Sequence, residues 1–208
     1  MAVVTVAQQK GGAGKTALAA HLGAYFAETR SVALIDIDPQ RSLARWHGLR
    51  MARAKPANPI TLAEIAGWRL PAEVAGLARR HAMVLVDTPP HTDTEARLAI
   101  RAADLVLVPI QPAPPDLWAA EATLALAAAE RRPVRLVFNR APAASRLRSL
   151  LEAEIAERGL ALLAAALGNR MGFAGAFAAG LGVSEASPRS RAADEIRSLA
   201  AEIEGVLG

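Results

Sequence analysis

The chain has 208 residues, of which 52% are hydrophobic, and its formal net charge is +4. This length and composition predict one compact domain over residues 1–208 with a sizeable core. The absence of cysteine excludes disulfides, thiolate metal sites and cysteine nucleophiles. There is no secretory-signal pattern, and no apolar run reaches the roughly 18 residues of a membrane span. We therefore expect a cytoplasmic protein.

Buried-type strands and helical patterns alternate along the chain. In chain order we predict strand 2–8, helix 15–29, strand 31–37, helix 41–50, a proline-containing loop, helix 71–80, strands 83–87 and 105–110, helix 115–130, strand 134–138, and helices 143–158, 171–180 and 190–206. The stretch 160–167 fits either a strand or a helix. This alternation predicts an α/β fold, with a mostly parallel twisted sheet covered by helices on both faces.

Lysine is rare among the basic residues, since 21 are Arg and only Lys10, Lys15 and Lys55 are Lys. Two of these three lie five positions apart in a glycine-rich stretch between the first strand and the first helix. A lysine ammonium is a compact point charge, unlike the planar guanidinium of arginine, so its retention at these positions indicates a phosphate site.

The segment KGGAGKT, residues 10–16, has the composition of a loop that holds phosphate groups. Glycines let backbone N–H groups turn toward phosphate oxygens, and the following helix N-terminus adds partial positive charge. Lys15 is expected to reach the β- and γ-phosphates, and the Thr16 hydroxyl to bind Mg²⁺. The predicted cofactors are ATP and Mg²⁺, and the predicted nucleotide-binding residues of the loop are Gly11, Gly12, Ala13, Gly14, Lys15, Thr16 and Ala17.

Three motifs together resemble the ParA/MinD family of P-loop ATPases. Gln9 stands where the strict GxxxxGK[ST] pattern has its first glycine, and QKGGAGKT resembles the deviant Walker A motif of that family. The DIDPQ segment, residues 36–40, resembles the family's DxDPQ element. MVLVDTPP, residues 83–90, resembles its Walker B and switch II segment. The resemblance runs from about residue 2 to 204 and implies a P-loop NTPase fold of the deviant Walker A type.

The resemblance also implies roles for individual residues. Lys10 would reach across a homodimer interface to the partner's nucleotide, so that dimers form in the ATP state. Asp38 would position the attacking water, which suits a reaction that depends on placement and electrostatics. Asp36 and Asp87 would support Mg²⁺. Asn139, at the end of strand 134–138, would contact the adenine edge. The alternatives are that the acids of DIDPQ only cap the next helix and that Asn139 is a turn residue.

The charges of two segments indicate whether a further binding surface contacts DNA or a membrane. Residues 131–148 contain six arginines and no acid, which favours sequence-independent contact with duplex phosphates. Arg170, in GNRMGF, and the arginines of SPRSRAADEI resemble the family's basic DNA-contacting positions. The predicted DNA-binding residues are therefore Arg146, Arg148, Arg170, Arg189 and Arg191. Acidic residues outnumber the single basic one in the C-terminal EIRSLAAEIEGVLG, unlike a membrane-surface helix, so we expect no membrane partner.

The residues themselves predict a site for nucleotide and Mg²⁺ and a basic face. The family resemblance implies a weak ATPase that binds non-specific double-stranded DNA in its ATP state, is associated with the nucleoid, and partitions or positions a cargo. It also implies that a cargo-linked, ParB-like protein stimulates hydrolysis. The alternatives are a MinD-like regulator of division and an ATP-dependent metabolic synthetase on the same fold. A reductase or metal-delivery ATPase is disfavoured because cysteine is absent and His21, His47, His81 and His91 show no ligand spacing.

Overall fold

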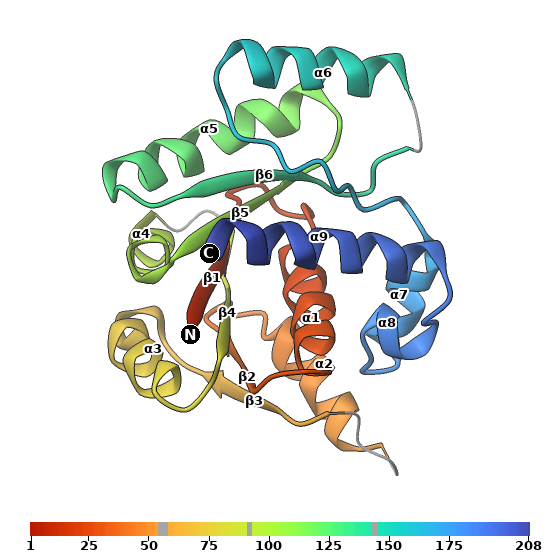
Figure 1. The fold of residues 1–208 in the computed structure, drawn as a ribbon. Coiled ribbons are helices and arrows are strands. Elements are labelled where there is room, and N and C mark those ends of the chain that lie inside the picture. Colours follow the sequence, from red (N-terminus) through yellow and green to blue (C-terminus); the bar gives the residue numbers. More distant parts are fainter. Residues whose placement is uncertain (54–57, 91–92, 143–144) are drawn as a thin grey trace.

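The computed structural model describes residues 1–53, 58–90, 93–142 and 145–208, and its ribbon is drawn in Figure 1. The strands are β1 (Ala2–Val6), β2 (Val32–Asp36), β3 (Ile60–Glu64), β4 (Met83–Asp87), β5 (Leu105–Ile110) and β6 (Val134–Phe138). The helices are α1 (Lys15–Phe26), α2 (Ser42–Met51), the 3₁₀ turn η1 (Gly67–Arg69), α3 (Leu70–Ala78), α4 (Asp93–Ala102), α5 (Pro114–Ala129), α6 (Arg146–Glu157), α7 (Met171–Ala178), α8 (Val183–Ala186) and α9 (Arg191–Leu207).

The six strands form one sheet in the order β3-β2-β4-β1-β5-β6, and every neighbouring pair is parallel. The predicted α/β fold is therefore confirmed, with a fully parallel sheet among the described residues. Because the strands are parallel, their carboxyl ends lie at one edge of the sheet, where ligands bind in folds of this kind. Asp36 and Asp87 are register partners at the ends of β2 and β4.

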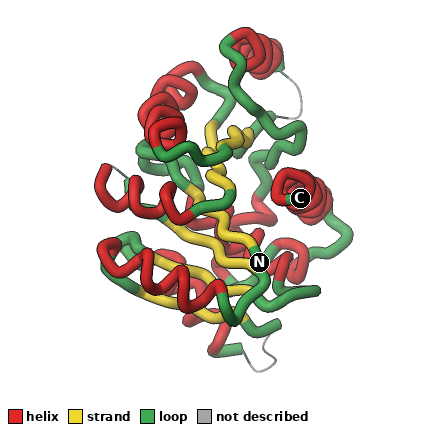
Figure 2. Tube along the Cα trace, turned by 60° about the vertical axis from the view of Figure 1, so that its left-hand side comes forward, coloured by secondary structure: helices red, strands yellow, loops and turns green. Residues whose placement is uncertain are grey.

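Helices cover both faces of the sheet, and Figure 2 shows the strands enclosed between them. Alternate strand residues point to opposite faces. Val4 and Leu34 pack into a cluster with α1 and α9, whereas Val3 and Ile35 pack into another with α3. A third cluster joins β5 and β6 to α5 and α6. Strands buried on both faces explain the nearly continuous apolar runs in the sequence.

Several elements differ from the sequence prediction, among them η1 and α8, which were not predicted. Residues 60–64, placed in a loop, form the edge strand β3, which pairs with β2. Its pattern is weak because only Ile60 is fully buried. Helix α4 was not predicted and spans 93–102. Helix α6 begins at Arg146, and residues 143–144 of the predicted helix 143–158 lie outside the described residues.

The ambiguous stretch 160–167 is neither a regular strand nor a helix. It runs beside β6 and makes two isolated parallel bridges, Leu136 with Leu162 and Ala141 with Gly168. Acidic side chains of α9 accept hydrogen bonds from several of its backbone N–H groups. The Glu202 carboxylate accepts from residues 164 and 165 at 2.8 and 2.7 Å. Backbone hydrogen bonds join the stretch to β6, from the Leu136 N–H to the Ala161 carbonyl at 2.8 Å and from the Leu163 N–H to the Leu136 carbonyl at 2.9 Å. The stretch therefore continues the sheet edge beside β6 without forming a regular strand, and α9 also holds it.

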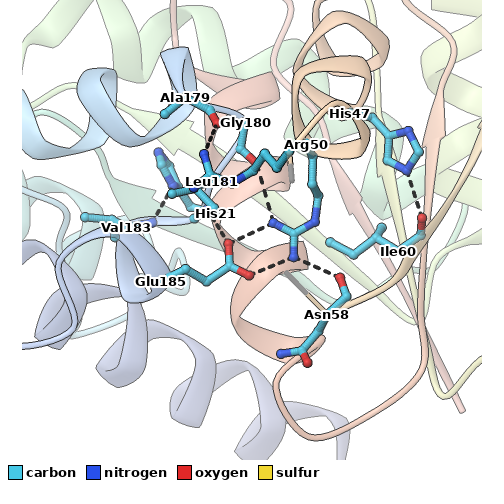
Figure 3. Close-up of polar contacts among 12 residues, drawn as sticks. His21, His47, Arg50, Asn58, Ile60, Ala179, Gly180, Leu181, Val183 and Glu185 are labelled. Carbon is cyan, nitrogen blue, oxygen red and sulfur yellow. Dashed lines mark hydrogen bonds and ion pairs between the residues drawn. The ribbon is translucent and has the colours of Figure 1, made fainter. Parts of the chain in front are cut away.

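A buried polar cluster ties α2 to the segment between α7 and α9 (Figure 3). The Arg50 side chain is almost fully buried and donates two hydrogen bonds, at 2.8 and 2.7 Å, to the Glu185 carboxylate. The Trp46 indole N–H donates to the Leu181 carbonyl at 3.3 Å. Gly180 has a φ of 68°, and a Cβ there would lie 2.4 Å from the Arg50 backbone nitrogen. Only glycine fits this contact.

We predict that Gly180→Ala lowers the free energy of unfolding by about 2–5 kcal/mol, because it adds left-handed strain to a steric clash. Gly205→Ala is the matched control, since a Cβ at this position in α9 meets nothing within 4 Å. It should raise stability by about 0.5–1 kcal/mol. Urea unfolding measures both changes. Equal stability of the two variants would contradict the tight packing of α2 against residue 180.

Candidate nucleotide-binding site

The loop between β1 and α1 has the backbone conformation that its glycines predict. Gly12 and Gly14 have φ values of 78° and 88°, in the left-handed region that favours glycine. Gly14 precedes the first residue of α1, and a Cβ there would lie 2.3 Å from the Asn139 amide nitrogen. This loop borders a pocket of about 320 Å³ whose lining includes Gly11, Gly12, Gly14, Lys15, Thr16 and Ala17. The predicted phosphate-binding residues therefore line one cavity, except for Ala13, which is buried beneath it.

Lys15 begins α1 and is mostly withdrawn from solvent. Burial lowers the pKa of its ammonium group, and the nearby carboxylates of Asp87 and Asp38 act in the opposite direction. A partly desolvated ammonium at a helix N-terminus gains strongly from an anionic ligand. The position of Lys15 suits the phosphate contact predicted for it, and that contact stays a prediction.

Asp87 ends β4 in a fully buried position. Burial raises the pKa of its carboxyl to about 7, with the Thr16 hydroxyl and the Lys15 charge lowering it and the Asp36 charge raising it. Within the described parts of the chain, neither carboxylate oxygen has a hydrogen-bond partner of normal geometry. Burial also raises the pKa of Asp36, against the hydrogen bonds from the backbone N–H groups of Ala44 and Asp38.

This donor set fits Mg²⁺. An unpaired buried carboxylate beside a hydroxyl and a second carboxylate supplies the hard oxygen ligands that the ion prefers. No group of three or more His, Asp or Glu side chains in the described parts of the chain could enclose a metal alone. Mg²⁺ usually keeps several water ligands and needs only one or two carboxylates from the protein. The predicted metal residues Thr16, Asp36 and Asp87 are thus near one another, and their role stays a prediction.

Asp38 borders the same pocket as the phosphate loop. One of its carboxylate oxygens accepts a hydrogen bond from the Gln40 backbone N–H at 2.9 Å, and its own N–H donates to Asp36 at 3.0 Å. These contacts fix the turn after β2. The place of Asp38 beside the phosphate loop suits the water positioning predicted for it, and that role stays a prediction.

The Lys10 ammonium forms an ion pair with a carboxylate of the same chain. Its ammonium donates to Asp116 Oδ2 at 2.5 Å, and the Asp116 side chain is 3% exposed against 38% for Lys10. The other Asp116 oxygen accepts from the Gln111 backbone N–H at 3.3 Å. Sequence reasoning did not identify Asp116, which lies in the first turn of α5 after the proline-rich corner of residues 109–115.

Asn139 follows β6 and contacts the phosphate loop directly. Its amide nitrogen donates to the Ala13 carbonyl at 2.8 Å, and its oxygen accepts from the Arg140 N–H at 3.0 Å. It also borders a second pocket of about 380 Å³, whose walls include Leu18, Leu167, Met171, Phe173 and Phe177. This largely apolar pocket suits a flat base. The predicted adenine contact is untested, and the amide is engaged with the loop.

The five arginines predicted to bind DNA differ in their surroundings. Arg146, Arg189 and Arg191 are exposed at the start of α6 and around the start of α9. Arg148 is half-buried and pairs with Glu152 at 2.8 Å. Arg170 borders the second pocket and pairs with Glu195 at 2.6 Å. In Figure 1 the first turns of α6 and α9 lie on the same side of the molecule.

No described helix is long and apolar enough to cross a membrane. The C-terminal helix α9 buries its apolar side, including Ile196, Leu199 and Ile203, against the body of the protein.

Of the four histidines, His91 lies outside the described residues. His21 is buried, and burial lowers its pKa to about 4, so its imidazole is neutral at pH 7.

A parallel sheet with a lysine-bearing glycine loop at its carboxyl edge defines a nucleotide-binding protein of the P-loop class. The family model for the CobQ/CobB/MinD/ParA nucleotide binding domain matches residues 4–202. The chain belongs to this family and is an ATPase of the ParA/MinD type.

Individual relatives and solved structures agree with this assignment. The maintenance of carboxysome distribution protein A of Halothiobacillus neapolitanus is 29% identical over 209 residues, covering 96% of this chain and 95% of the relative. Protein ParA of Rhizobium radiobacter is 33% identical over 135 residues, covering 64% of this chain and 60% of the relative. The Cyanothece McdA(D38A)–ATP complex shares the fold, with a TM-score of 0.81 at 19% identity, covering 100% of this chain and 96% of that one.

Lys15 and Asp38 should separate binding from hydrolysis. We predict that Lys15→Ala abolishes ATP binding, because the loop loses its main positive charge. Asp38→Ala should bind ATP about as well as the wild type but hydrolyse it at least about tenfold more slowly, because the attacking water is no longer held. Equilibrium titration with ATP and a phosphate-release assay distinguish the two. Wild-type turnover in Asp38→Ala would contradict its role, and unchanged affinity in Lys15→Ala would contradict the loop assignment.

Proposed function

We propose that this protein is a nucleotide-switched dimer that uses ATP to position a cargo on DNA. The observation that supports the proposal best is the grouping of Lys10, Lys15, Asp38 and Asp87 around one glycine loop. In this grouping two lysines lie beside carboxylates that would hold Mg²⁺ and a water molecule. The arrangement suits phosphoryl transfer, in which catalysis depends mainly on the placement of the reactants and the neutralisation of charge.

In this proposal ATP would occupy the phosphate-loop pocket, and Thr16, Asp36 and Asp87 would hold Mg²⁺ beside it. The ion would neutralise phosphate charge during hydrolysis. Lys15 binds the β- and γ-phosphates. Asp38 orients the water that attacks the γ-phosphate. The raised pKa of Asp87 falls when a cation binds beside it, so the carboxylate is ionised in the loaded state.

Dimer formation depends on Lys10. A lysine that contacts the partner's nucleotide must leave Asp116, whose carboxylate is then left buried without its cation. Removing one partner of a buried pair costs about 3–5 kcal/mol, but Lys10 is partly exposed, so we expect a cost nearer the roughly 1 kcal/mol of a surface pair. The Lys10–Asp116 pair therefore favours the monomer until two bound nucleotides compensate for its loss.

The closed dimer would bind duplex DNA through exposed arginines at the starts of α6 and α9, chiefly Arg146, Arg189 and Arg191. Phosphate contacts of this kind are independent of sequence and sensitive to salt. Arg148 and Arg170 contribute less, since each already neutralises a glutamate. The protein would work in the cytoplasm on the nucleoid. A MinD-like membrane role is less well supported, because α9 packs its apolar side inward.

The cargo is inferred from relatives. Two of them, from Halothiobacillus neapolitanus and Gloeobacter kilaueensis, are named for maintaining carboxysome distribution, and others are named for chromosome partitioning. What these names have in common is the distribution or partitioning of a large cellular body. A cargo-bound partner protein would stimulate hydrolysis and release the dimer.

We predict that substitutions of Lys10 and Asp116 change ATP-dependent dimerisation in opposite directions. Lys10→Ala should abolish the dimer that forms with a non-hydrolysable ATP analogue, because the cross-subunit contact is lost. Asp116→Asn should form the dimer at about tenfold lower protein concentration, because Lys10 is released at no electrostatic cost. The asparagine oxygen can still accept the hydrogen bond from residue 111. Sedimentation velocity over a concentration series measures both changes.

Glu121→Gln is the control for the loss of one carboxylate from α5, because among the described residues Glu121 forms its ion pair with the exposed Arg158 alone. It should dimerise like the wild type. A wild-type protein that stays monomeric with the analogue would contradict the proposed switch. A folded Asp116→Asn protein with wild-type or weaker dimerisation would contradict the restraining role of Asp116.

A further inference from the structure

Two pockets meet beside the phosphate loop. The loop pocket of about 320 Å³ and the apolar pocket of about 380 Å³ share four lining residues, which are Gly14, Ala17, Arg140 and Phe177. Arg140 is the only charged residue among the four. A ligand that places phosphates in the first pocket and an aromatic base in the second must pass this side chain.

The backbone of Arg140 is held in an unusual conformation. Its φ of 52° lies in the left-handed region, which costs an ordinary residue about 1–2 kcal/mol. The Arg140 N–H donates to the Asn139 side-chain oxygen at 3.0 Å, and the Asn139 amide donates to the Ala13 carbonyl at 2.8 Å. One side chain thus ties the conformation of Arg140 to that of the phosphate loop. Strained residues of this kind gather at ligand sites.

The guanidinium of Arg140 is exposed and pairs with no carboxylate among the described residues. Arg170, which borders the same apolar pocket, is neutralised by Glu195. Arg140 therefore supplies the unpaired positive charge at the junction. A planar guanidinium with five donors can bind a phosphate oxygen and a sugar hydroxyl together, which a lysine cannot do.

We infer that Arg140 binds the α-phosphate and ribose of the nucleotide at the junction of the two pockets. The inference rests on the proposed function, because it takes the loop as the site of the β- and γ-phosphates. It adds a nucleotide contact outside the loop and its carboxylates. It also gives Asn139 a positioning role, since the Asn139 oxygen fixes the Arg140 backbone.

The test is calorimetric titration of ADP and, separately, of pyrophosphate into the full chain without DNA. Arg140→Ala should weaken ADP binding by about tenfold, as expected for one charge-assisted hydrogen-bonding group. The ADP affinity of Arg140→Lys should lie between those of Arg140→Ala and the wild type, because lysine keeps the positive charge but lacks the planar guanidinium with its several donors. Both should bind pyrophosphate nearly as the wild type does. Arg79→Ala, at the exposed end of α3, is the matched control and should leave both affinities unchanged.

Thermal unfolding of each variant checks that it is folded. Unchanged ADP affinity in a folded Arg140→Ala protein would overturn the inference alone. An equal loss of affinity for ADP and pyrophosphate would also overturn it, because the arginine would then act only through its general positive field. A wild-type chain that binds no ADP would overturn the proposed nucleotide switch, and this inference with it.

Discussion

The site depends on the parallel direction of all six described strands. Because each strand ends at the same edge, the loop after β1, the carboxylates of Asp36 and Asp87 and the amide of Asn139 converge without any long-range loop to carry them. An antiparallel β4 would place Asp87 at the opposite edge. Burial on both faces holds the strands rigidly, so the chemical groups at their ends are preorganised before a ligand arrives.

At this edge of the sheet, several groups that are predicted to bind ligands already contact other residues of the protein. Lys10 is held by Asp116, and the amide of Asn139 is held by the Ala13 carbonyl. Asp87, in contrast, is buried and has no hydrogen bond of normal geometry among the described residues. In the proposed switch, groups that already have partners would exchange them when nucleotide or a second subunit arrives, whereas Asp87 would gain a ligand. The cost of closing would then be concentrated in a few exchangeable contacts at the edge of a rigid sheet.

The sequence predicted the sheet well where strands are fully buried. The bounds of β4, β5 and β6 agree with the predicted strands, because continuous Val, Ile and Leu runs bounded by turn residues are unambiguous. Strand β3 was not predicted, because it is an edge strand that is exposed on much of its length. Arg170 was predicted as a DNA contact from charge and from its resemblance to basic positions of the family, and its pairing with Glu195 depends on the packing of α9. Asp116 was not found from sequence because its partner Lys10 lies 106 positions away. Arg140 was not singled out because the two pockets that it borders form only when the end of β6 lies beside the phosphate loop.

The central claim is that nucleotide controls DNA binding. Its most direct test is fluorescence anisotropy of a labelled random-sequence duplex with ATP, with ADP and without nucleotide, each at low and moderate salt. The account predicts binding with ATP alone, weakening as salt rises because the contacts are to phosphates. Equal binding in all three nucleotide states, or no binding with ATP at low salt, would contradict it.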